Sequence, residues 1–394
     1  MGRTGICGAR RLRAGWRGVY GVWPRFPSRP AIRPRRRGGS RSPLGKARLR
    51  RPGGFERCRP AMTPIPHPLL VGDIGGTNAR FALVPEPGAA PIPVLHTRTA
   101  DHASVEEALS EAIARSPVRP AGMVLCVAAF IMGRTARLTN AGWTFDGPAL
   151  ARRFALGGGL LLNDFEAAAL SLAVLRGEDV TPIGAPVPVG RGARVILGPG
   201  TGLGVAALVE AGGSTIAVPG EAGHVSFGPA NPAEETFWPH IERVAGRITP
   251  EVLLSGPGLL RLHRALAASE GREVPETEPA EIAEKARSRA CPHCMNAVRA
   301  FLDLLARFAG DMGIALGATG GVYLRGGVIS SLAPMIDGDR FREAFTDKEP
   351  VGAFARAIPS FLMTSEDAVM RGLAAVGAAP GRFGLHDPER LWVA

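Results

Sequence analysis

The chain of 394 residues is 45% hydrophobic and 21% charged, proportions that are typical of a globular protein and exclude a wholly disordered or fibrous one. Its formal net charge of +12 at first suggests a nucleic-acid or anionic-membrane partner. Residues 1–60, however, contain 17 arginines, one lysine and one acidic residue, whereas the remaining 334 residues carry 29 basic and 34 acidic side chains. The body of the protein is therefore mildly acidic, and we expect no nucleic-acid partner for it.

The basic N-terminal stretch is rich in arginine, glycine and proline, a composition that buries too little apolar surface to fold. Three interpretations stay open: a nucleic-acid-binding tail, an arginine-rich targeting segment, or translated upstream sequence before a start at Met62. We favour the third, because Met62 directly precedes the first predicted strand. We expect residues 1–61 to be a disordered extension.

Cysteine content and hydropathy indicate a reducing, aqueous compartment. Five cysteines are few and odd in number, which favours free thiols over a disulfide framework. Cys291 and Cys294 form a lone C-x-x-C motif; because a zinc knuckle needs a second pair nearby, we expect two thiols at the start of a helix. The longest uncharged stretch, 195–209, is too short to cross a bilayer. We therefore predict a cytoplasmic protein without a membrane partner.

Apolar runs alternate with helical patterns along the body of the chain. The predicted strands are 68–72, 80–84, 123–129, 160–162, 195–197, 205–209 and 322–324. A helix is predicted after Ser104, whose spacing to Glu107 makes a capping box, and further helices at 165–175, 259–268 and 296–316. Strands that alternate with helices indicate an α/β fold.

The first glycine motif, Asp73-Ile-Gly-Gly-Thr-Asn78, lies in the turn between the first two predicted strands. Adjacent glycines let the backbone approach a ligand closely, and consecutive N–H groups in such a turn bind anions. An ordinary hairpin turn is the competing interpretation. Asp73 favours a phosphate site, because a carboxylate beside a phosphate is unfavourable unless a cation such as Mg²⁺ lies between them.

Two further glycine motifs follow predicted strands. Gly198-Pro-Gly-Thr-Gly-Leu-Gly204 joins one strand to the next, so it is neither a Walker A loop nor a dinucleotide fingerprint. Gly326-Gly327 follows the strand at 322–324. Two strand-to-strand glycine loops suggest two related half-domains that face one nucleotide, although any single glycine pair is compatible with a simple turn.

Several polar residues occupy positions suited to catalysis or sugar binding. Asn163-Asp164 lies at a predicted strand-to-helix junction, where asparagine and aspartate commonly cap helices. The competing interpretation is catalytic, because a carboxylate at the end of a strand faces the crevice of an α/β fold and can accept the proton of a hydroxyl group. Glu221 and His224 share a glycine-bearing loop and suit the hydroxyls of a polyol; a single histidine there disfavours a metal. Glu251 is equally compatible with a first-turn helix carboxylate.

Together these motifs resemble the bacterial glucokinase family, in whose order they occur over residues 69–375. The resemblance implies an α/β fold of the hexokinase and actin-like ATPase superfamily, with two ribonuclease H-like domains that flank a cleft. It implies a small domain at 62–174 plus 375–394 and a large domain at 175–374. A last helix at about 366–376 is expected to pack on the small domain.

The resemblance also implies ATP-dependent phosphorylation of the 6-hydroxyl of glucose, with Mg²⁺ bound through the nucleotide phosphates. Asp164 would be the general base. Sugar hydroxyls would be held by Asn163, Gly202, Glu221, His224 and Glu251. ATP would contact Gly72, Asp73, Ile74, Gly75, Gly76, Thr77, Gly200, Thr201, Gly326 and Gly327. No metal ligand is assigned to the chain itself, and a homodimer is left open.

Two departures from the family pattern and three alternatives remain. Phe130 replaces a proline common near the sugar, and Ala222 replaces a common glycine, so sugar affinity or loop closure is expected to differ. A kinase of another hexose and a polyphosphate-using glucokinase stay open. A sugar-sensing regulator would need a helix-turn-helix, for which residues 1–60 leave little room. The related repressor and sugar-kinase family carries a cysteine-rich zinc motif where this chain has 225–230, without cysteine.

Overall fold

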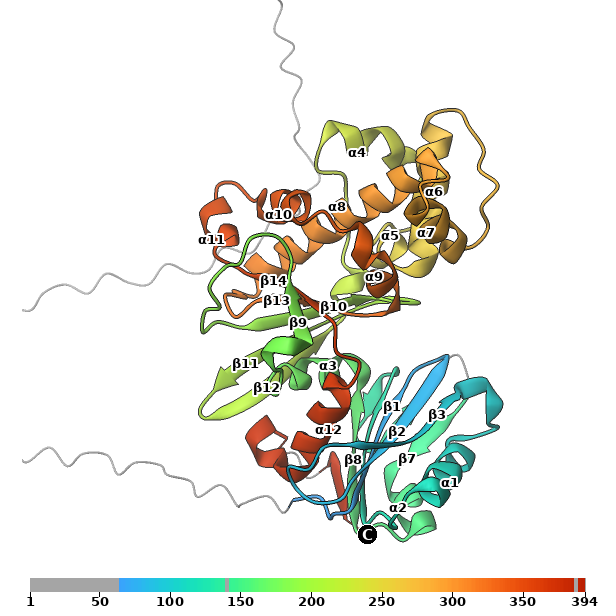
Figure 1. Ribbon diagram of the computed structural model, residues 1–394, viewed down its shortest axis with the longest axis vertical. Helices are drawn as coiled ribbons and strands as arrows, with labels where there is room; N and C mark the ends of the chain where they lie inside the picture. The colour runs from blue at the N-terminus through green and yellow to red at the C-terminus, as the bar shows by residue number, and fades with distance from the viewer. Residues whose placement is uncertain (1–63, 139–141, 386–388, 394) are drawn as a thin grey trace, which may run out of the picture. The chain divides into compact units, whose positions relative to one another are not determined.

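Two six-stranded sheets form the framework of the protein, whose computed structural model describes residues 64–138, 142–385 and 389–393 (Figure 1). All of these residues lie within one compact unit, Arg59–Ala394. The predictions made for residues 1–61, including a start at Met62, fall outside the described residues.

The first sheet has the strand order β15-β8-β4-β1-β2-β3. Strands β1, β4 and β8 run parallel and are almost wholly buried, as expected for strands covered on both faces. The other neighbouring pairs are antiparallel. The strands are β1 (Leu69–Ile74), β2 (Asn78–Val84), β3 (Ile92–Arg98), β4 (Gly122–Val127), β8 (Gly158–Asn163) and β15 (Leu391–Val393).

The second sheet has the order β12-β11-β10-β13-β14-β9 and repeats the plan of the first. Strands β10, β11 and β12 form an antiparallel meander. On the other side of β10 lie β13 and then β14, which both run parallel to it. Its strands are β9 (Val180–Pro182), β10 (Arg194–Pro199), β11 (Leu203–Ala211), β12 (Ser214–Gly220), β13 (Val322–Leu324) and β14 (Ser360–Met363). A small third sheet contains β5 (Ile131–Met132), β6 (Thr135–Arg137) and β7 (Thr144–Asp146).

Helices cover both faces of the first sheet. Helix α1 (Val105–Arg115) begins at the predicted cap: Ser104 accepts the N–H of Glu107, while the Glu107 carboxylate accepts the N–H of Ala103, one residue before the N-cap, so the Ser104 half of the predicted capping box is present. Helix α12 (Ala368–Ala378) packs against β1 and β4 through one shared apolar cluster, as expected for the last long helix. Helix α2 (Gly147–Phe154) contacts β8.

Helix α3 (Asp164–Ser171) contacts strands of both sheets, so it connects the two halves of the protein. It is shorter than the predicted 165–175. The helix ends at Ser171. The carbonyl of the next residue, Leu172, accepts a hydrogen bond of 2.6 Å from the side chain of Arg194 in the second sheet. This helix carries the residues at the centre of the pocket described below.

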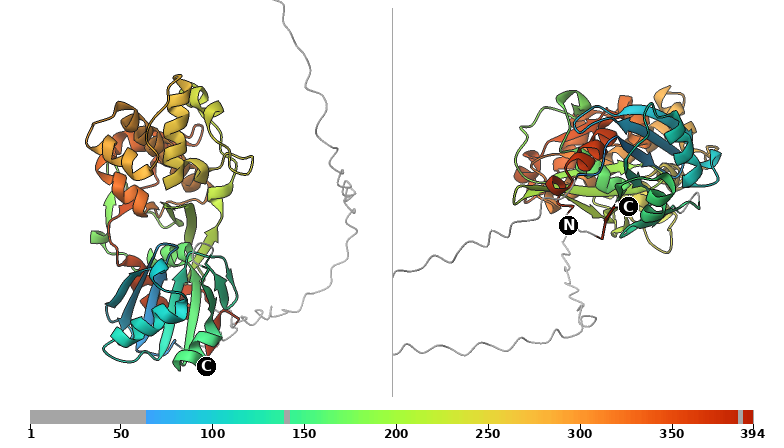
Figure 2. Two further views of the ribbon diagram at one scale, coloured as in Figure 1. Left: turned by 90° about the vertical axis from the view of Figure 1, so that its right-hand side faces the viewer. Right: turned by 90° about the horizontal axis from the view of Figure 1, so that it is seen from below.

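The remaining helices form a layer on the side of the second sheet (Figure 2), and all of them except α11 contribute residues to one large apolar core. They are α4 (Pro232–Phe237), α5 (Pro250–Leu253), α6 (Gly256–Ser269), α7 (Pro279–Arg287), α8 (Pro292–Ala315), α9 (Gly327–Leu332), α10 (Gly338–Thr346) and α11 (Gly352–Arg356). Short 3₁₀ helices lie at Thr99–Asp101, Gly177–Asp179, Ala222–His224, Trp238–His240, Ala333–Met335 and Pro380–Phe383. Among the described residues, none of these helices combines the length and the apolarity that a bilayer span requires.

Candidate active site

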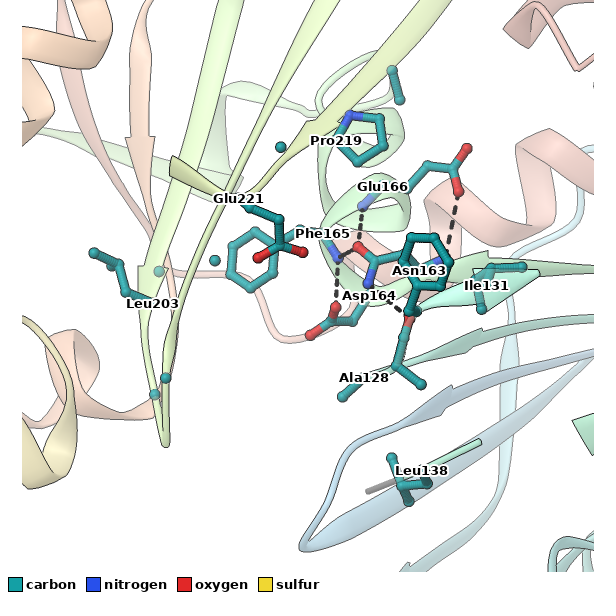
Figure 3. Close-up of a pocket in the computed structure, with 18 of the residues that line it drawn as sticks. Ala128, Ile131, Leu138, Asn163, Asp164, Phe165, Glu166, Leu203, Pro219 and Glu221 are labelled. Atoms are coloured by element: carbon teal, nitrogen blue, oxygen red, sulfur yellow. Dashed lines mark hydrogen bonds between the residues drawn. The ribbon is translucent and has the colours of Figure 1, made fainter. Parts of the chain in front are cut away.

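A pocket of about 1310 Å³ is lined by residues of both sheets and collects many of the polar residues predicted to be functional. Figure 3 shows the carboxylate of Asp164 directed into the open space, with Leu203 and Glu221 on the side of the second sheet. The predicted residues that line the pocket are Gly76, Asn163, Asp164, Gly200, Thr201, Gly202, Glu221, His224 and Glu251.

Asn163 takes the helix-capping role that the sequence offered as one interpretation of this junction. It is the N-cap of α3: its side-chain oxygen accepts the N–H groups of Phe165 at 2.9 Å and Glu166 at 3.2 Å. Its side-chain nitrogen donates to the carbonyl of Ala129 at 3.1 Å, which joins the start of α3 to the loop after β4. Because Asn163 caps the helix, the next residue, Asp164, is held at the mouth of the pocket.

The environment of Asp164 is suited to accepting a proton near neutral pH. The pKa of its carboxyl is raised to about 6, mainly by burial, and the nearby carboxylate of Asp73 contributes to this rise. The N–H of Phe165 and the guanidinium of Arg325 act in the opposite direction on this pKa. A carboxylate whose pKa lies close to the working pH is an effective general base.

Arg325 is a residue near the site that the sequence analysis did not single out. It directly follows β13, and its positive charge acts to lower the pKa of both the Asp164 carboxyl and the Cys126 thiol. The backbone carbonyl of Arg325 packs closely against Gly198. A Cβ on Gly198 would stand 2.6 Å from that carbonyl oxygen, so a larger residue there would clash with it. The only sequence signal was its position between a buried strand and the Gly326-Gly327 pair.

Glu221, His224 and Glu251 form a polar cluster on the second-sheet side of the pocket. His224 lies 3.6 Å from Glu221 and 3.9 Å from Glu251, measured from ring nitrogen to carboxylate oxygen. Glu251 is in the first turn of α5, as its alternative interpretation required, and it also accepts the N–H of Leu203 at 2.8 Å. Three side chains that can donate to or accept from hydroxyls therefore converge here.

Gly202 stands directly beside this cluster. A Cβ built on Gly202 would lie 2.4 Å from Oε2 of Glu251, so a larger residue would displace the carboxylate. Gly198 and Gly204 serve a different purpose, since both leave room for the ring of Phe165. This close approach lets α3 pack against the β10–β11 hairpin, a role for these glycines that the sequence did not indicate.

The turn at Gly75 to Asn78 is a hairpin tip, as predicted. The N–H of Gly75 donates to the carbonyl of Asn78 at 2.8 Å, and Thr99 binds this tip through its hydroxyl on the carbonyl of Gly75, at 2.9 Å. Asp73 lies at the end of β1, where its carboxylate accepts the thiol of Cys126 at 3.3 Å. Of this segment, Gly76 lines the pocket.

Apart from Gly76, Gly200 and Thr201, the predicted nucleotide residues lie outside the pocket lining. Gly72 and Ile74 are buried within β1, and a Cβ on Gly72 would stand 2.7 Å from Leu125. Thr77 is exposed at the hairpin tip. Gly326 has a φ of +113°, which favours glycine, and it packs against the carbonyl of Pro199 beside the second glycine loop; Gly327 begins α9.

The two residues that depart from the family pattern differ in their surroundings. Phe130 is 80% exposed and lines the pocket, so its ring is available to a bound ligand. Ala222 begins a 3₁₀ helix and packs against the core of the second half. Its φ is not in the left-handed region, so the alanine adds no backbone strain.

The two mixed sheets and the pocket lined by both define an α/β protein of the sugar-kinase class with an actin-like fold. The crystal structure of glucokinase from an Antarctic psychrotroph matches with a TM-score of 0.71 and 28% identity, over 79% of this chain and 98% of that chain. Glucokinase from Balamuthia mandrillaris in complex with glucose has the same fold, with a TM-score of 0.65 and 23% identity over 79% of this chain and 93% of that chain.

Sequence comparison is more specific than the fold. The glucokinase of Mesorhizobium japonicum is 40% identical over 84% of this chain and 98% of its own length, and that of Sinorhizobium fredii is 41% identical over 82% and 96%. The sequence profile of the glucokinase family matches residues 70–379. The chain belongs to the glucokinase family. The family resemblance and the fold class predicted from the sequence are thereby confirmed.

Proposed function

We propose that the protein transfers the γ-phosphoryl group of ATP to the 6-hydroxyl of glucose. The observation that carries this proposal is the placement of the Asp164 carboxylate in one pocket with Asn163, Glu221, His224 and Glu251. Membership of the glucokinase family supports the same activity. A half-buried carboxylate opposite several hydroxyl-binding groups suits deprotonation of one sugar hydroxyl while the others are held.

In the proposed reaction Asp164 is the general base. Its carboxylate accepts the hydroxyl proton as the sugar oxygen attacks the γ-phosphorus, and the bond from that phosphorus to the bridging oxygen of ADP breaks. The products are the sugar phosphate, ADP and a protonated Asp164, which then returns its proton to solvent. Asn163 and the cap that it forms on α3 keep this carboxylate at the pocket mouth.

Sugar hydroxyls are proposed to bind Glu221, His224, Glu251, Asn163 and the backbone at Gly202. The convergence of the first three side chains supports this assignment. The hydrogen bond from Leu203 to Glu251 holds one carboxylate oxygen in place before sugar binds, which reduces the entropy lost on binding.

ATP is proposed to bind between two sets of backbone turns. The hairpin tip at Gly76 and Thr77 is proposed to present N–H groups from the first sheet, while the N–H of Gly75 is bonded to Asn78 and Gly72 to Ile74 lie in the paired strand β1 just before it. Gly200-Thr201 and Gly326-Gly327 come from the second sheet, where Gly326 packs against the β10–β11 loop.

Mg²⁺ is proposed to bind through the nucleotide phosphates, with Asp73 as the available carboxylate. The donor chemistry fits, because Asp73 and Asp164 are close enough for one carboxylate to raise the pKa of the other, and a hard cation binds carboxylate oxygens. When bound, Mg²⁺ neutralises charge on the transferred phosphoryl group.

Sugar binding is proposed to draw together a domain at 62–174 plus 375–394 and a domain at 175–374. Exclusion of water and alignment of the hydroxyl for in-line attack would follow. Phe130, exposed on the pocket rim, is then placed to cover the sugar. The sparse cysteines support a cytoplasmic location, and a homodimer stays a proposal.

A coupled assay of ADP release tests the proposal. The purified protein is assayed with glucose, mannose, fructose and N-acetylglucosamine, by ADP release when ATP is the donor and by the amount of sugar phosphate formed when polyphosphate is the donor. We expect the highest kcat/KM with glucose and ATP, and a product that carries phosphate on oxygen 6 by phosphorus NMR. A higher kcat/KM with another hexose or with polyphosphate would replace glucose or ATP in the proposal.

A further inference from the structure

A second cluster of chemically reactive side chains lies among the helices that cover the second sheet, and none of its members lines the active-site pocket. His263 is on α6, Glu276 is in the segment between α6 and α7, and Cys294 is in the first turn of α8. Their ligand atoms all lie within 4.8 Å of one another, and all three residues are buried. The cluster therefore joins three helical segments at one buried point.

Glu276 is an unusual residue for its position, because it is a carboxylate in a loop and only 3% exposed. Its Oε2 lies 3.0 Å from Nε2 of His263, and its Oε1 accepts a hydrogen bond from Lys285 at 3.0 Å. Although burial alone raises the pKa of Glu276, these two hydrogen bonds lower it to about 2. The Glu276 carboxylate is therefore flanked by the His263 ring on one oxygen and the Lys285 ammonium on the other.

His263 is directed into this cluster. Its side chain is 1% exposed, and Nε2 faces Glu276. The other ring nitrogen, Nδ1, is buried without a hydrogen-bond partner in the part of the chain that the structure describes. A buried imidazole is expected to satisfy both nitrogens, so the contact of Nε2 with Glu276 is the hydrogen bond that orients this ring among the described residues.

The C-x-x-C motif supplies a fourth side chain. Cys291 caps α8 and accepts the N–H of Cys294 at 3.3 Å, which confirms that the two thiols start a helix. Burial, followed by the neighbouring Cys291 and Glu276, raises the pKa of the Cys294 thiol to about 12. Both cysteines are free thiols. The fold thus brings histidine and glutamate to the cysteine pair, although no second cysteine pair exists in the sequence.

We propose that His263, Glu276, Cys291 and Cys294 bind a structural zinc ion that joins α6, the α6–α7 segment and α8. Two sulfurs, one imidazole nitrogen and one carboxylate oxygen are ligands that Zn²⁺ accepts in closed four-coordinate sites. Ideal zinc-to-ligand distances place neighbouring ligand atoms roughly 3.3–3.8 Å apart. The ligand atoms of His263, Glu276 and Cys294 already lie within 4.8 Å of one another, and Cys291, whose sulfur accepts the N–H of Cys294 at 3.3 Å, would turn its thiol toward them as the fourth ligand.

The charges also balance. Two thiolates and Glu276 carry three negative charges, and Zn²⁺ with Lys285 carries three positive charges. Binding releases the thiol protons of Cys291 and Cys294 to solvent, and His263 binds through Nε2 with its proton on Nδ1. Lys285, which bonds the outer oxygen of Glu276, orients that ligand from behind. A neutral group of this kind avoids the large desolvation penalty of an uncompensated buried charge.

The test measures bound metal and does not depend on kinase activity. Full-length protein without a histidine tag is reduced, loaded with zinc and desalted, and its zinc content is determined by mass spectrometry. His263→Gln and Cys294→Ser are compared with His293→Gln. His293 is a matched control because it lies inside the same motif, yet its ring faces Arg272 and Glu270 at the surface.

We expect about one zinc per chain in the unmodified protein and in His293→Gln, and loss of it in the other two variants. Cobalt in place of zinc should show a thiolate-to-cobalt charge-transfer band in the unmodified protein. A chelator should lower the melting temperature of the unmodified protein but not that of Cys294→Ser.

Three results would overturn the proposal. The first is that the loaded, unmodified protein retains no zinc, a result that does not depend on how any variant folds. The second is that His263→Gln and His293→Gln retain equal amounts of zinc. The third is that the metal-free protein, isolated under thiol alkylation, contains a Cys291–Cys294 disulfide and gains no zinc after reduction.

Discussion

Glu166 binds Arg390 through two parallel hydrogen bonds of 2.8 Å, although 224 residues separate them in the sequence. The same carboxylate accepts the N–H of Asn163 at 3.4 Å, in the capping box of α3. The last described segment of the chain is thus bonded to the turn that presents Asp164. This contact makes Arg390 a positioning residue for the proposed base.

Replacement of Arg390 by methionine tests this positioning role. Glu166 is nearly fully buried and would lose its cation, so we expect a loss of about 1–3 kcal/mol in the free energy of unfolding. We also expect kcat to fall more than the KM for glucose changes, because Asp164 would be less well oriented. The control is Arg115→Met, which breaks an exposed pair with Glu111 and should change stability by less than about 1 kcal/mol. Equal kcat in both variants would contradict the role.

Asp164→Asn removes the proposed base while it keeps the shape of the side chain. We expect kcat to fall by about 10²–10⁴-fold, because general-base catalysis contributes on that order, while glucose affinity measured by calorimetry stays within a few fold. Asp146→Asn is the matched control, since Asp146 is an exposed N-cap of α2 and asparagine caps helices equally well. Normal turnover in Asp164→Asn would falsify the base assignment.

The pH dependence of kcat/KM follows from the raised pKa of Asp164. The base acts as a carboxylate, so activity should fall about tenfold per pH unit below pH 6, the pKa that burial gives this carboxyl in the free enzyme. The rate should be level from about pH 7 upward until another group titrates. A profile measured with glucose below its KM, at constant ionic strength, checks this. A midpoint near the ordinary aspartate pKa of 3.8 would show that Asp164 is not the titrating group.

The same pKa predicts how Asp164 affects stability. A carboxyl whose pKa rises on folding binds more protons in the folded state, so its stabilising effect is present below pH 3.8 and is lost as pH rises through about 6. The ionised carboxylate should therefore cost about 3 kcal/mol at pH 7. Asp164→Asn should raise the melting temperature at pH 7 and not at pH 4. Thermal unfolding at both pH values tests this, and a lower melting temperature of the variant at pH 7 would contradict it.

Gly202→Ala tests the contact between the second glycine loop and Glu251. The added Cβ would stand 2.4 Å from Oε2 of Glu251, so the carboxylate must move and lose the N–H of Leu203. We expect the KM for glucose to rise roughly tenfold or more, since a hydrogen bond to a charged group is lost. Gly228→Ala is the control, because a Cβ there meets nothing within 4 Å. An unchanged KM in Gly202→Ala would remove Glu251 from the sugar site.

Local patterns accounted for much of the fold and for the central residue of the site. The hairpin of β1 and β2 was predictable because apolar runs flank a glycine turn, and α1 because Ser104 and Glu107 satisfy its first N–H groups. The junction at Asp164 was predictable for a similar reason, since a buried strand ended at a capping residue. Each of these signals depends on neighbours within a few residues in the chain.

The tertiary structure decided the contacts that depend on distant segments. The approach of Arg325 to Asp164, the room that Gly204 leaves for Phe165, and the meeting of Glu276 with Cys294 each join residues from different elements. The raised pKa of Asp164 belongs to the same group of properties, because removal of water is a property of the packed interior. The sequence by itself determined which side chains could take part in chemistry; only packing decided which of them meet, because burial and long-range pairing are absent from any local pattern.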